Sequence, residues 1–459
     1  MELIQINKVN EIINEVYNQS GESYLKMTTS YYITKIRDLS YYEFFKVNNM
    51  NIDYVIQPHN VRTIENILSK AYLKFMKPHI ENMRRKIAYM DSIPLIEQRT
   101  QEWFDQRNNL LSASSIYKVL GSETGIKELL FEKIGIAKEF TQSAPTIHGT
   151  VFEIVSQTVY ESRNNITIKE YGCIPHPKHN FIGASPDGLV YNVNHIDMHS
   201  IDLNDEDLQI DSRVKMEDIS LFGRLLEIKN PYSRSITSTI PSHYEKQVIT
   251  QEEVCGIPHC DFLEMNYNFY DNIDEFLKDV FEFDTLKDLS LKEQDQFIKN
   301  HNIPLCNLCR NGVEKGILLK IEKPGGKFEG VLYDLNTPYN KEDILKWIAE
   351  NQQMIKNGKA INIEVKYFNI NDYDIKTHFF NDYNWKTIYE SAKNVWSRIL
   401  EERLMSDEQI KEKYKELVYS VSNNCDMTPD NSKKRKSTTK YQLRNLMKKP
   451  KHEKVLYKF

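Results

Sequence analysis

The stretch that decides the fold is "FIGASPDGLVYN" at 181–192, which "RLLEIKNPYS" at 224–233 follows along the chain. Both are apolar runs of strand length next to turn residues, and they predict two strands of one sheet. Asp187, Glu227 and Lys229 stand inside or beside these runs, where an unpaired charge is costly. Three charged residues at such positions call for a physical reason.

Glu227 and Lys229 are two residues apart, so their side chains lie on the same face of the predicted strand, and Leu226 and Ile228 lie on the other. Such alternation is also typical of a half-solvated strand, and Pro-Asp-Gly alone is an ordinary turn. A divalent cation would explain the whole set, because Mg²⁺ prefers carboxylate oxygens and supports phosphodiester hydrolysis. In this hypothesis Asp187 and Glu227 bind the ion, and Lys229 holds or deprotonates the attacking water.

These residues resemble the PD-(D/E)XK nuclease motif. More narrowly, "SPDGLV" and "LLEIKNP" are similar to the phage lambda exonuclease and YqaJ-type viral recombinase family, which occurs in large nucleocytoplasmic DNA viruses. Three more motifs in the same order support the resemblance: "QRTQEWFDQRNNLLSASSIYKVLG" at 98–121, "HGTVFE" at 148–153 and "YEKQVITQEEVCG" at 244–256. The resemblance covers roughly residues 95–270, a little over a third of the chain.

The resemblance implies an α/β fold, a PD-(D/E)XK restriction-endonuclease-like core whose mixed central sheet is flanked by helices. We expect this core at 92–275, with an insert loop at 195–222. Apolar residues that recur at spacings of three and four predict a helical N-terminal accessory region at 1–91. An α+β C-terminal extension is expected at 276–425, and a basic disordered tail at 426–459.

The resemblance also implies a larger catalytic site than the two strands indicate. The implied metal ligands are Asp187, Glu227, Glu153 and the backbone carbonyl of Ile228, and the implied catalytic residues include Lys229 and Gln247. A glutamate on a helix, as Glu153 would be, is otherwise usually solvated. The family carries two glutamines on the helix that corresponds to 244–256. Gln247 stands at the first of these positions, and Ile249 stands at the second. Gln251 is a secondary candidate for the role of the second glutamine.

A second group of residues, implied by the same resemblance, would bind the phosphate of a DNA end. Its members are Arg107, Ser112, Ser114 and Ser185. Arginine suits phosphate through its fixed fork of donors, and a serine near a helix N-terminus adds to an anion pocket. The alternatives are a plain serine N-cap and an Arg107 that lies on the surface or pairs with Glu102 or Asp105 of its own helix.

The predicted activity is that of a metal-dependent DNA exonuclease that uses Mg²⁺ or Mn²⁺. It would digest duplex DNA from its ends, with 5′-to-3′ polarity, for viral DNA recombination, repair or genome processing. Two alternatives remain open: an endonuclease or RNase with the same site, and a catalytically idle nucleic-acid-binding protein. Double-stranded DNA ends are the expected partner, the resemblance suggests a single-strand annealing protein as another, and the oligomeric state stays open.

Composition adds limits on the compartment and on the partners. The 459 residues contain no run of eighteen apolar residues, so no membrane partner is expected. Six cysteines in so long a chain predict no disulfide framework, and the N-terminal stretch is amphipathic and acidic, unlike a signal peptide. We therefore expect an intracellular, reducing location, which for a viral protein is the host nucleus or a cytoplasmic viral factory.

Two weaker signals lie in the C-terminal half. "CNLC" at 306–309 has the spacing of half a zinc site, and two ordinary cysteines are the favoured interpretation. From Lys433 onward eleven basic residues accompany one acid, so this tail carries +10 while the rest of the chain carries −15 of the total −5. The tail is interpreted as a nuclear import signal, a nonspecific DNA-binding segment or a solvated tail with neither role.

Overall fold

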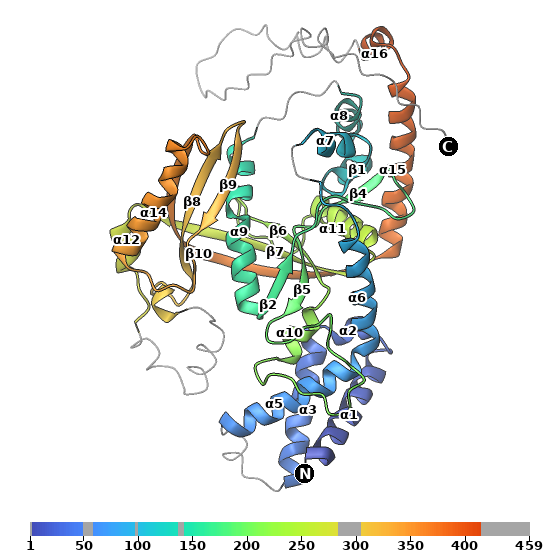
Figure 1. Ribbon diagram of the computed structural model, residues 1–459. Helices are drawn as coiled ribbons and strands as arrows, with labels where there is room; N and C mark the ends of the chain where they lie inside the picture. Colours follow the sequence, from blue (N-terminus) through green and yellow to red (C-terminus); the bar gives the residue numbers. More distant parts are fainter. Residues whose placement is uncertain (1, 49–57, 97–99, 136–141, 283–303, 415–459) are drawn as a thin grey trace.

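The computed structural model describes residues 2–48, 58–96, 100–135, 142–282 and 304–414. Its centre is a mixed seven-stranded sheet in the order β2-β5-β6-β7-β10-β8-β9 (Figure 1). The strands are β2 (Ile166–Lys169), β5 (Gly188–Val193), β6 (Leu225–Lys229), β7 (His259–Tyr270), β10 (Asn362–Phe379), β8 (Lys315–Lys323) and β9 (Lys327–Leu332). Within this sheet only β6 and β7 pair in parallel, and the other neighbours are antiparallel.

The two stretches quoted from the sequence form adjacent strands, β5 and β6. Gly188 pairs with Leu226 across them. A Cβ at Gly188 would lie 2.4 Å from Cγ2 of Ile168 on β2, so only glycine lets β2 pack this closely against β5. Residues 225–228 of β6 are all buried, because the strand has neighbours on both sides and helices over it. The alternative of a half-solvated strand is therefore wrong, because β6 is an interior strand.

Two helices cover the sheet near these strands. On α9 (Ala144–Asn164), Ser156 hydrogen-bonds with Tyr267 of β7, which places α9 on one face. On α11 (Ser242–Cys255), Tyr244 packs its ring on Phe262 of β7, which points to the other face. The helix ends follow ordinary capping rules: the hydroxyl of Ser143 accepts from the backbone nitrogen of Thr146 at the start of α9.

A small three-stranded sheet adjoins α11. Its order is β1-β4-β3, from β1 (Leu111–Ser112), β4 (Ile182–Ala184) and β3 (Ile174–Pro175). In the chain, β1 follows α7 (Gln101–Asn108). The 3₁₀ helix η1 (Ala113–Leu120) and then α8 (Glu123–Lys133) come after β1. η1 begins after Ser112 and ends before Gly121.

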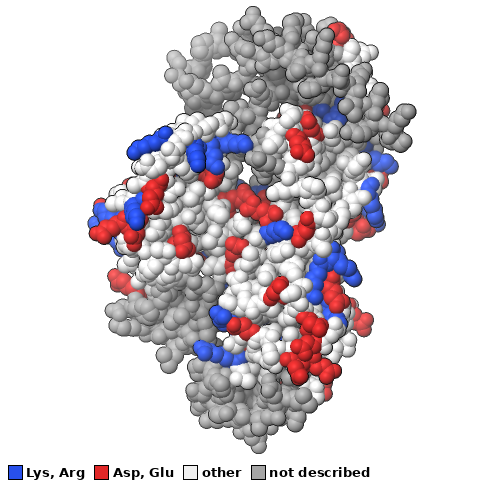
Figure 2. All heavy atoms as spheres, in the orientation of Figure 1, with Lys and Arg blue, Asp and Glu red and all other residues white. Residues whose placement is uncertain are grey.

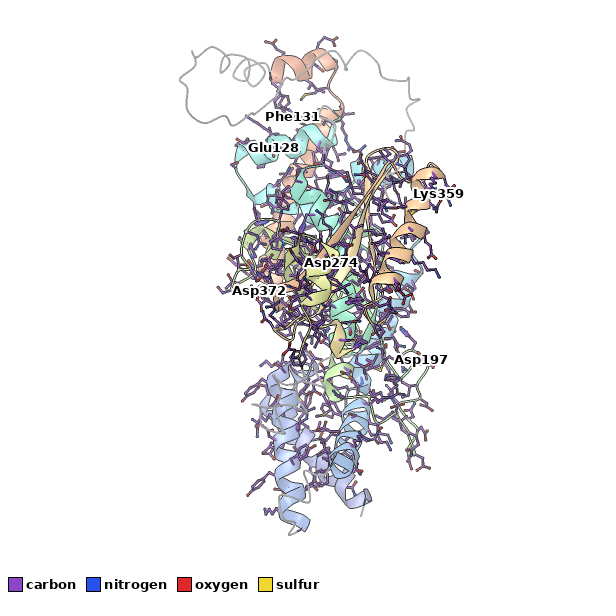
Figure 3. The ribbon with its side chains drawn as sticks, turned by 90° about the vertical axis from the view of Figure 1, so that its left-hand side faces the viewer. Glu128, Phe131, Asp197, Asp274, Lys359 and Asp372 are labelled. Carbon is purple, nitrogen blue, oxygen red and sulfur yellow. The ribbon has the colours of Figure 1, made fainter. Side chains whose placement is uncertain are left out.

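The N-terminal region is helical, as its apolar spacing predicts. Its helices are α1 (Glu2–Gln19), α2 (Tyr24–Met27), α3 (Ser30–Asn48), α5 (Pro58–Phe75) and α6 (Lys77–Asp91). They project from one end of the sheet, and α8, which carries Glu128 and Phe131, lies at the opposite end (Figure 3).

The insert at 195–222 is not only a loop. It contains the helix α10 (Met216–Leu221) and several buried apolar side chains that join the main core. It also binds the N-terminal helices: Arg84 donates to the backbone oxygens of Met198 and Ile201, and Arg37 donates to Glu217 at 2.7 Å. The sequence pattern missed α10 because the segment's apolar residues are sparse and are buried against a distant part of the chain.

The C-terminal half shares the sheet with the first half. β10 pairs with β7 along most of its length, from Tyr367–Tyr270 to Phe379–His259, so the sheet continues across the boundary expected at 275 and 276. The remaining elements are α12 (Ile273–Lys278), η3 (Leu305–Asn307), α14 (Lys341–Lys356), α15 (Asp382–Arg403) and α16 (Asp407–Lys413). The predicted tail at 426–459 lies outside the described residues.

The mixed sheet with flanking helices, the helical N-terminal region and the α+β C-terminal part confirm the predicted α/β architecture. No helix among the described residues combines the length and the apolar character needed to cross a bilayer.

A buried ion pair joins the sheet to the N-terminal helices. Arg224 Nη1 lies 3.1 Å from Asp261 Oδ1, and its other terminal nitrogen donates to the backbone oxygen of Thr28. Arg224 is 5% exposed and Asp261 2%, so neither charge has much water to replace a lost partner.

We expect Arg224→Met to lower the free energy of unfolding by about 3–5 kcal/mol, because Asp261 would keep a buried charge without its cation. The exposed pair of Arg213 with Asp211 offers the control, since Arg213→Met leaves a carboxylate that water solvates and should cost far less stability. Urea unfolding followed by circular dichroism measures both. Equal destabilisation by the two variants would show that burial does not decide the outcome.

Candidate active site

Asp187, Glu227 and Lys229 meet where β5 begins beside β6. Asp187 directly precedes β5, and its Oδ2 accepts a hydrogen bond of 2.7 Å from the backbone nitrogen of Ile228, 41 positions away in the chain. Lys229 Nζ contacts Oε1 of Glu227. The antiparallel pairing of Gly188 with Leu226 sets this register, so two distant segments place their charged groups together.

Glu227 is the centre of the group and is fully buried, with 0% of its surface exposed. Gln247 Nε2 donates to Oε1 at 2.6 Å, and Gln251 Nε2 donates to Oε2 at 2.6 Å. Both glutamines come from α11 and are four residues apart, so they share one helix face. A buried carboxylate needs such donors, because burial removes its water.

Gln251 thus occupies the place expected of the family's second glutamine. Ile249, which stands at that position in the sequence motif, is buried among apolar residues of the main core. Gln251 also donates to the backbone oxygen of Ser185 at 3.4 Å. The sequence already indicated that Gln251 could replace a glutamine at position 249, because Gln247 and Gln251 are four residues apart.

Glu153 brings a third carboxylate from α9, on the opposite face of the sheet from α11. Burial, and then the negative charges of Glu170 and Glu227, raise its pKa to about 7, and Lys229 opposes them. Burial and then Glu227 likewise raise the pKa of Asp187 well above its usual range. The site therefore holds more negative charge than its one lysine balances.

Lys229 remains protonated in this setting. Burial lowers its pKa, but Glu227 and then Asp187 outweigh burial, so the net shift of the pKa is upward. Its ammonium group also lies 5.0 Å from the ring centre of Tyr244. A lysine with a raised pKa is a poor proton acceptor, so its position suits it to hold a water molecule or to balance negative charge.

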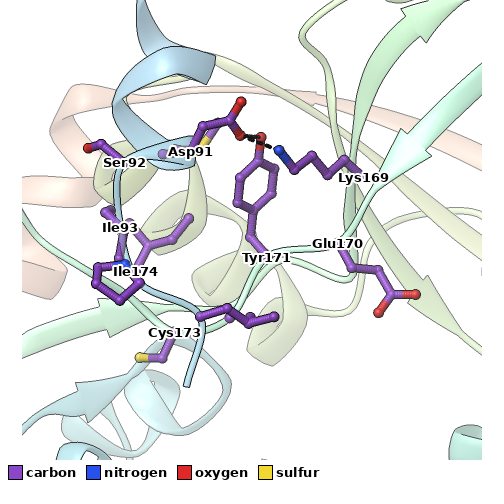
Figure 4. A pocket seen from close by; sticks show the side chains of 12 residues that line it. Asp91, Ser92, Ile93, Lys169, Glu170, Tyr171, Cys173 and Ile174 are labelled. Atoms are coloured by element: carbon purple, nitrogen blue, oxygen red, sulfur yellow. Dashed lines mark hydrogen bonds and ion pairs between the residues drawn. The ribbon is translucent and has the colours of Figure 1, made fainter. Parts of the chain in front are cut away.

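Glu170 is a residue that the sequence analysis missed. It is exposed and lies just after β2, beside a pocket of ≈ 340 Å³ lined by residues 90–95 and 169–174 (Figure 4). Lys169 and Tyr171 both donate to Asp91 at 2.6 Å, while Glu170 points away from that group, as strand alternation requires. In the sequence it is a single acid after the short run "ITIK" at 166–169, and no motif marks it.

The phosphate-binding candidates form a second group. Arg107 lies in the last turn of α7, and its Nη2 lies 3.4 Å from Oγ of Ser112, which in turn lies 3.2 Å from Oγ of Ser114. The guanidinium lies 4.7 Å from the ring centre of Trp103. In the part of the chain that the structure describes, no carboxylate pairs with Arg107, which removes Glu102 and Asp105 as the explanation for it.

The backbone around Arg107 is held by two cations that the sequence analysis did not single out. Lys133, 3% exposed, donates to the backbone oxygen of Arg107 at 2.8 Å. Arg403 at the end of α15 donates to the backbone oxygens of Lys133 and Asn108. No sequence pattern indicates these contacts, because they join residues up to 295 positions apart.

One short segment links the two groups. Ser112 pairs with Gly183 in the parallel ladder of β1 and β4, and Asp187 follows four residues later. Ser185, between them, is exposed, and its hydroxyl donates to the backbone oxygen of Tyr171 at 3.2 Å. The phosphate-binding candidates and the carboxylates thus lie at two ends of residues 183–187.

The oxygen donors fit a hard divalent cation in their chemistry. Asp187, Glu227 and Glu153 are carboxylates, and the pKa values of Asp187 and Glu153 are raised in part by their acidic neighbours; Mg²⁺ takes such ligands. The set is not preformed: over the described ranges no three His, Cys, Asp or Glu residues have metal-binding spacing. Oε1 of Glu227 accepts from Gln247 and contacts Lys229, while Oε2 accepts from Gln251. A carboxylate oxygen can accept two bonds, so the second acceptor position of Oε2 can take a cation with both glutamines in place.

The CNLC pair contributes no metal site among the described residues. Cys306 is exposed and Cys309 is buried, and both are free thiols. His301, which lies near them in the sequence, is outside the described residues.

Comparison with known proteins finds a family match over the region that carries both candidate groups. The family model described as YqaJ-like viral recombinase domain matches residues 102–258. Those residues contain both candidate groups, from Arg107 to Gln251. Over residues 102–258 the chain is therefore similar to the YqaJ-like viral recombinase family. The matched domain ends just before β7, so the outer strands β10, β8 and β9 lie outside it.

The chain is also similar to viral proteins. An uncharacterized protein of Acanthamoeba polyphaga mimivirus is 32% identical over 233 residues, which are 48% of this chain and 39% of the relative. A protein of African swine fever virus is 28% identical over 159 residues, 33% of this chain and 44% of the relative. The chain thus matches about two fifths of the length of these curated relatives.

A solved structure to which the chain is similar is an alkaline exonuclease, LHK-Exo, from Laribacter hongkongensis. It is 16% identical, with a TM-score of 0.34, and the match covers 69% of this chain and 100% of that chain. The same figures hold for the crystal structure of LHK-Exo in complex with dAMP.

The raised pKa of Glu153 predicts a pH dependence of stability. Between its ordinary pKa of 4.5 and about 7, the folded state binds more protons than the unfolded state, so stability falls as pH rises. Glu153→Gln removes this charge, and we expect it to stabilise the metal-free protein at pH 8 by up to about 3 kcal/mol. At pH 4 the gain should vanish.

Thermal unfolding in EDTA across this pH range measures the effect. Glu390→Gln is the matched control, because Glu390 also lies within a long helix, α15, but is exposed to solvent. It should leave the pH dependence of unfolding as it is in wild type. A constant difference between wild type and Glu153→Gln at all pH values would contradict the shifted pKa.

Proposed function

We propose that this chain is a metal-dependent exonuclease that hydrolyses phosphodiester bonds at duplex DNA ends. The observation that carries the proposal is the gathering of Asp187, Glu153 and Lys229 around the buried Glu227. Excess negative charge in this first group calls for a cation. The second group, around Arg107, offers donors to a phosphate. Neither is explained by packing.

Mg²⁺ or Mn²⁺, when bound, would neutralise phosphate charge and activate the attacking water. Asp187, Glu227, Glu153 and the backbone carbonyl of Ile228 are the residues that would hold it. Gln247 and Gln251 orient the carboxylate of Glu227, as hydrogen-bond donors behind a ligand commonly do. Lys229, protonated, holds the water by hydrogen bonding and offsets the charge that develops on the phosphate.

Arg107 and the nearby serines support an end-directed enzyme. Arg107, Ser112 and Ser114 form a chain of donors without a carboxylate among the described residues, and Ser185 lies on the segment that connects them to Asp187. Phosphate contacts carry no base information, so digestion should show little sequence preference. The recombinase family and the viral relatives support a role in viral DNA recombination, repair or genome processing, with 5′-to-3′ digestion as the proposed polarity.

An endonuclease or RNase with the same carboxylates is the second candidate, and the donors around Arg107 argue against it. An enzyme that ignores DNA ends has no need of a terminal phosphate site. If the protein were catalytically idle, the carboxylates and Lys229 would have no function, although their burial destabilises the fold. This argues against the idle alternative.

We expect Asp187→Asn to abolish metal-dependent digestion of linear duplex, with a loss of at least about 10³-fold, because it removes a carboxylate from the cation's ligands. DNA binding should persist, since the change removes a negative charge that faces phosphate. Linear and closed circular DNA, each with Mg²⁺ and with EDTA, separate the candidates.

Asp211→Asn, in the insert and paired there with the exposed Arg213, is the matched control and should digest DNA as wild type does. Cleavage of closed circles by wild type would favour the endonuclease. Digestion by Asp187→Asn at the wild-type rate would refute the assignment of the site.

Arg107→Ala tests the end-binding group separately. A charged hydrogen bond is worth about 1.5–3 kcal/mol, so digestion of 5′-phosphorylated linear duplex should slow about tenfold to a hundredfold. On a 5′-hydroxyl end the loss should be much smaller, because the charge that Arg107 binds is absent. Arg213→Ala is the control for loss of an exposed arginine.

Initial rates on the two ends measure this discrimination. If wild type digests both ends equally fast, there is no phosphate site, and the endonuclease becomes the better explanation.

A further inference from the structure

A group of aromatic rings lies beside the carboxylates and has no part in the chemistry proposed above. We call it the aromatic surface: Tyr232, His148, Phe269 and the ring beneath them, Phe152. Tyr232 is 57% exposed and Phe269 is 50% exposed, which is unusual for large rings that pack against one another.

The rings come from elements that also supply the candidate active site. Tyr232 follows Lys229 of β6 by three residues, and His148 precedes Glu153 on α9 by five. At 1.5 Å per residue, five residues of helix span about 7.5 Å. Along the axis of α9 the aromatic surface therefore begins within the length of a nucleotide unit of Glu153, although His148 lies about 140° around the helix from it.

His148 lies at the centre of the aromatic surface. Its ring centre is 4.5 Å from that of Phe152, 5.5 Å from that of Tyr232 and 6.5 Å from that of Phe269. Burial, and then the nearby Lys366, lower its pKa to about 4. The imidazole is therefore neutral at physiological pH, and the aromatic surface presents uncharged rings.

The support of the aromatic surface is rigid. Phe152 is 2% exposed and packs on Tyr267 and Phe368. Asn230, at the start of the segment that carries Tyr232, accepts hydrogen bonds from Ser156 at 2.6 Å and Tyr267 at 3.1 Å. Rings held from below but open above lose little freedom when a planar ligand stacks on them.

A second observation on α9 points to a ligand. Gly149 is inside the helix, where glycine costs about 1 kcal/mol relative to alanine, yet a Cβ there would meet nothing within 4 Å. Packing does not demand this glycine. It stands one turn before Glu153 and next to His148, and it leaves bare backbone that a sugar or phosphate can approach closely.

The basic residues beside Phe269 suit a polyanion. Lys366 lies 6.0 Å from the ring centre of Phe269, and Lys320 shares Glu364 with Lys366, so these three residues carry one excess positive charge. Figure 2 shows basic side chains over the β8–β9 side of the molecule and a hollow with acidic side chains beside it. Figure 1 places α9 next to β9 on that side.

We infer that the aromatic surface binds the unpaired bases of a DNA single strand, by stacking, next to the candidate active site. Stacking on aromatic rings accepts every base, which matches an enzyme without sequence preference. The inference rests on the proposed nuclease function for its choice of DNA. It adds a task that the carboxylates and Arg107 do not perform, which is to hold the strand by its bases.

Binding of fluorescent oligo(dT) in EDTA tests the inference without any cleavage. Tyr232→Leu and Phe269→Leu should each weaken binding about five- to hundred-fold, and the double variant should weaken it more, because one stacked base is lost at each ring. Tyr232→Phe keeps the ring and should bind as wild type does. Tyr42→Leu, at a tyrosine 63% exposed on α3, is the matched control and should also bind normally.

An abasic oligomer of the same length separates stacking from charge. Wild type should bind it about as weakly as the double variant binds oligo(dT), and the variants should bind blunt duplex nearly as wild type does. Equal affinity of wild type for the abasic and normal strands would overturn the inference and favour a protein partner on the aromatic surface. Unchanged oligo(dT) binding by both leucine variants would also overturn it.

The same variants distinguish this inference from the proposed function. If wild type digests no DNA with Mg²⁺, but Tyr232→Leu binds oligo(dT) more weakly than wild type does, the nuclease proposal fails and the stacking inference holds. If wild type digests DNA and both leucine variants bind oligo(dT) as tightly as wild type does, only the stacking inference fails.

Discussion

The structure depends on one constraint: the carboxylate of Glu227 is completely buried in the middle of a sheet. An acid at such a place must be supplied with donors by neighbouring elements. Here α11 provides Gln247 and Gln251, and β6 itself provides Lys229. The positions of α11 and of the β5–β6 pairing are therefore tied to the same few atoms as the proposed chemistry.

Those donors satisfy Glu227 but leave the group as a whole too negative. Asp187 and Glu153 both have raised pKa values, because burial and neighbouring acids disfavour their charged forms. Such a set destabilises the fold in the absence of a cation. Arg107 nearby has no carboxylate partner among the described residues. The carboxylates are suited to bind a cation, and the arginine at the other end of residues 183–187 is suited to bind an anion.

The C-terminal half contributes more than an extension. β10 continues the sheet beyond β7, and Arg403 at the end of α15 holds the backbone around Arg107. Phe368 of β10 also packs beneath the aromatic surface. The matched YqaJ-like domain ends before these elements, so its candidate sites rest on parts of the chain that the family motifs do not include.

The sequence by itself determined the α/β class, the strands around Asp187 and Glu227 and the helical N-terminal region, because alternation, helical spacing and turn residues are local signals. It also indicated a resemblance to the YqaJ-type viral recombinase family through four ordered motifs. Only the tertiary structure decided that Gln251 rather than Ile249 contacts Glu227, that Glu170 and Arg403 belong beside the candidate groups, and that the insert folds against the N-terminal helices. These contacts join distant residues whose burial and charge acquire meaning only once the sheet is assembled.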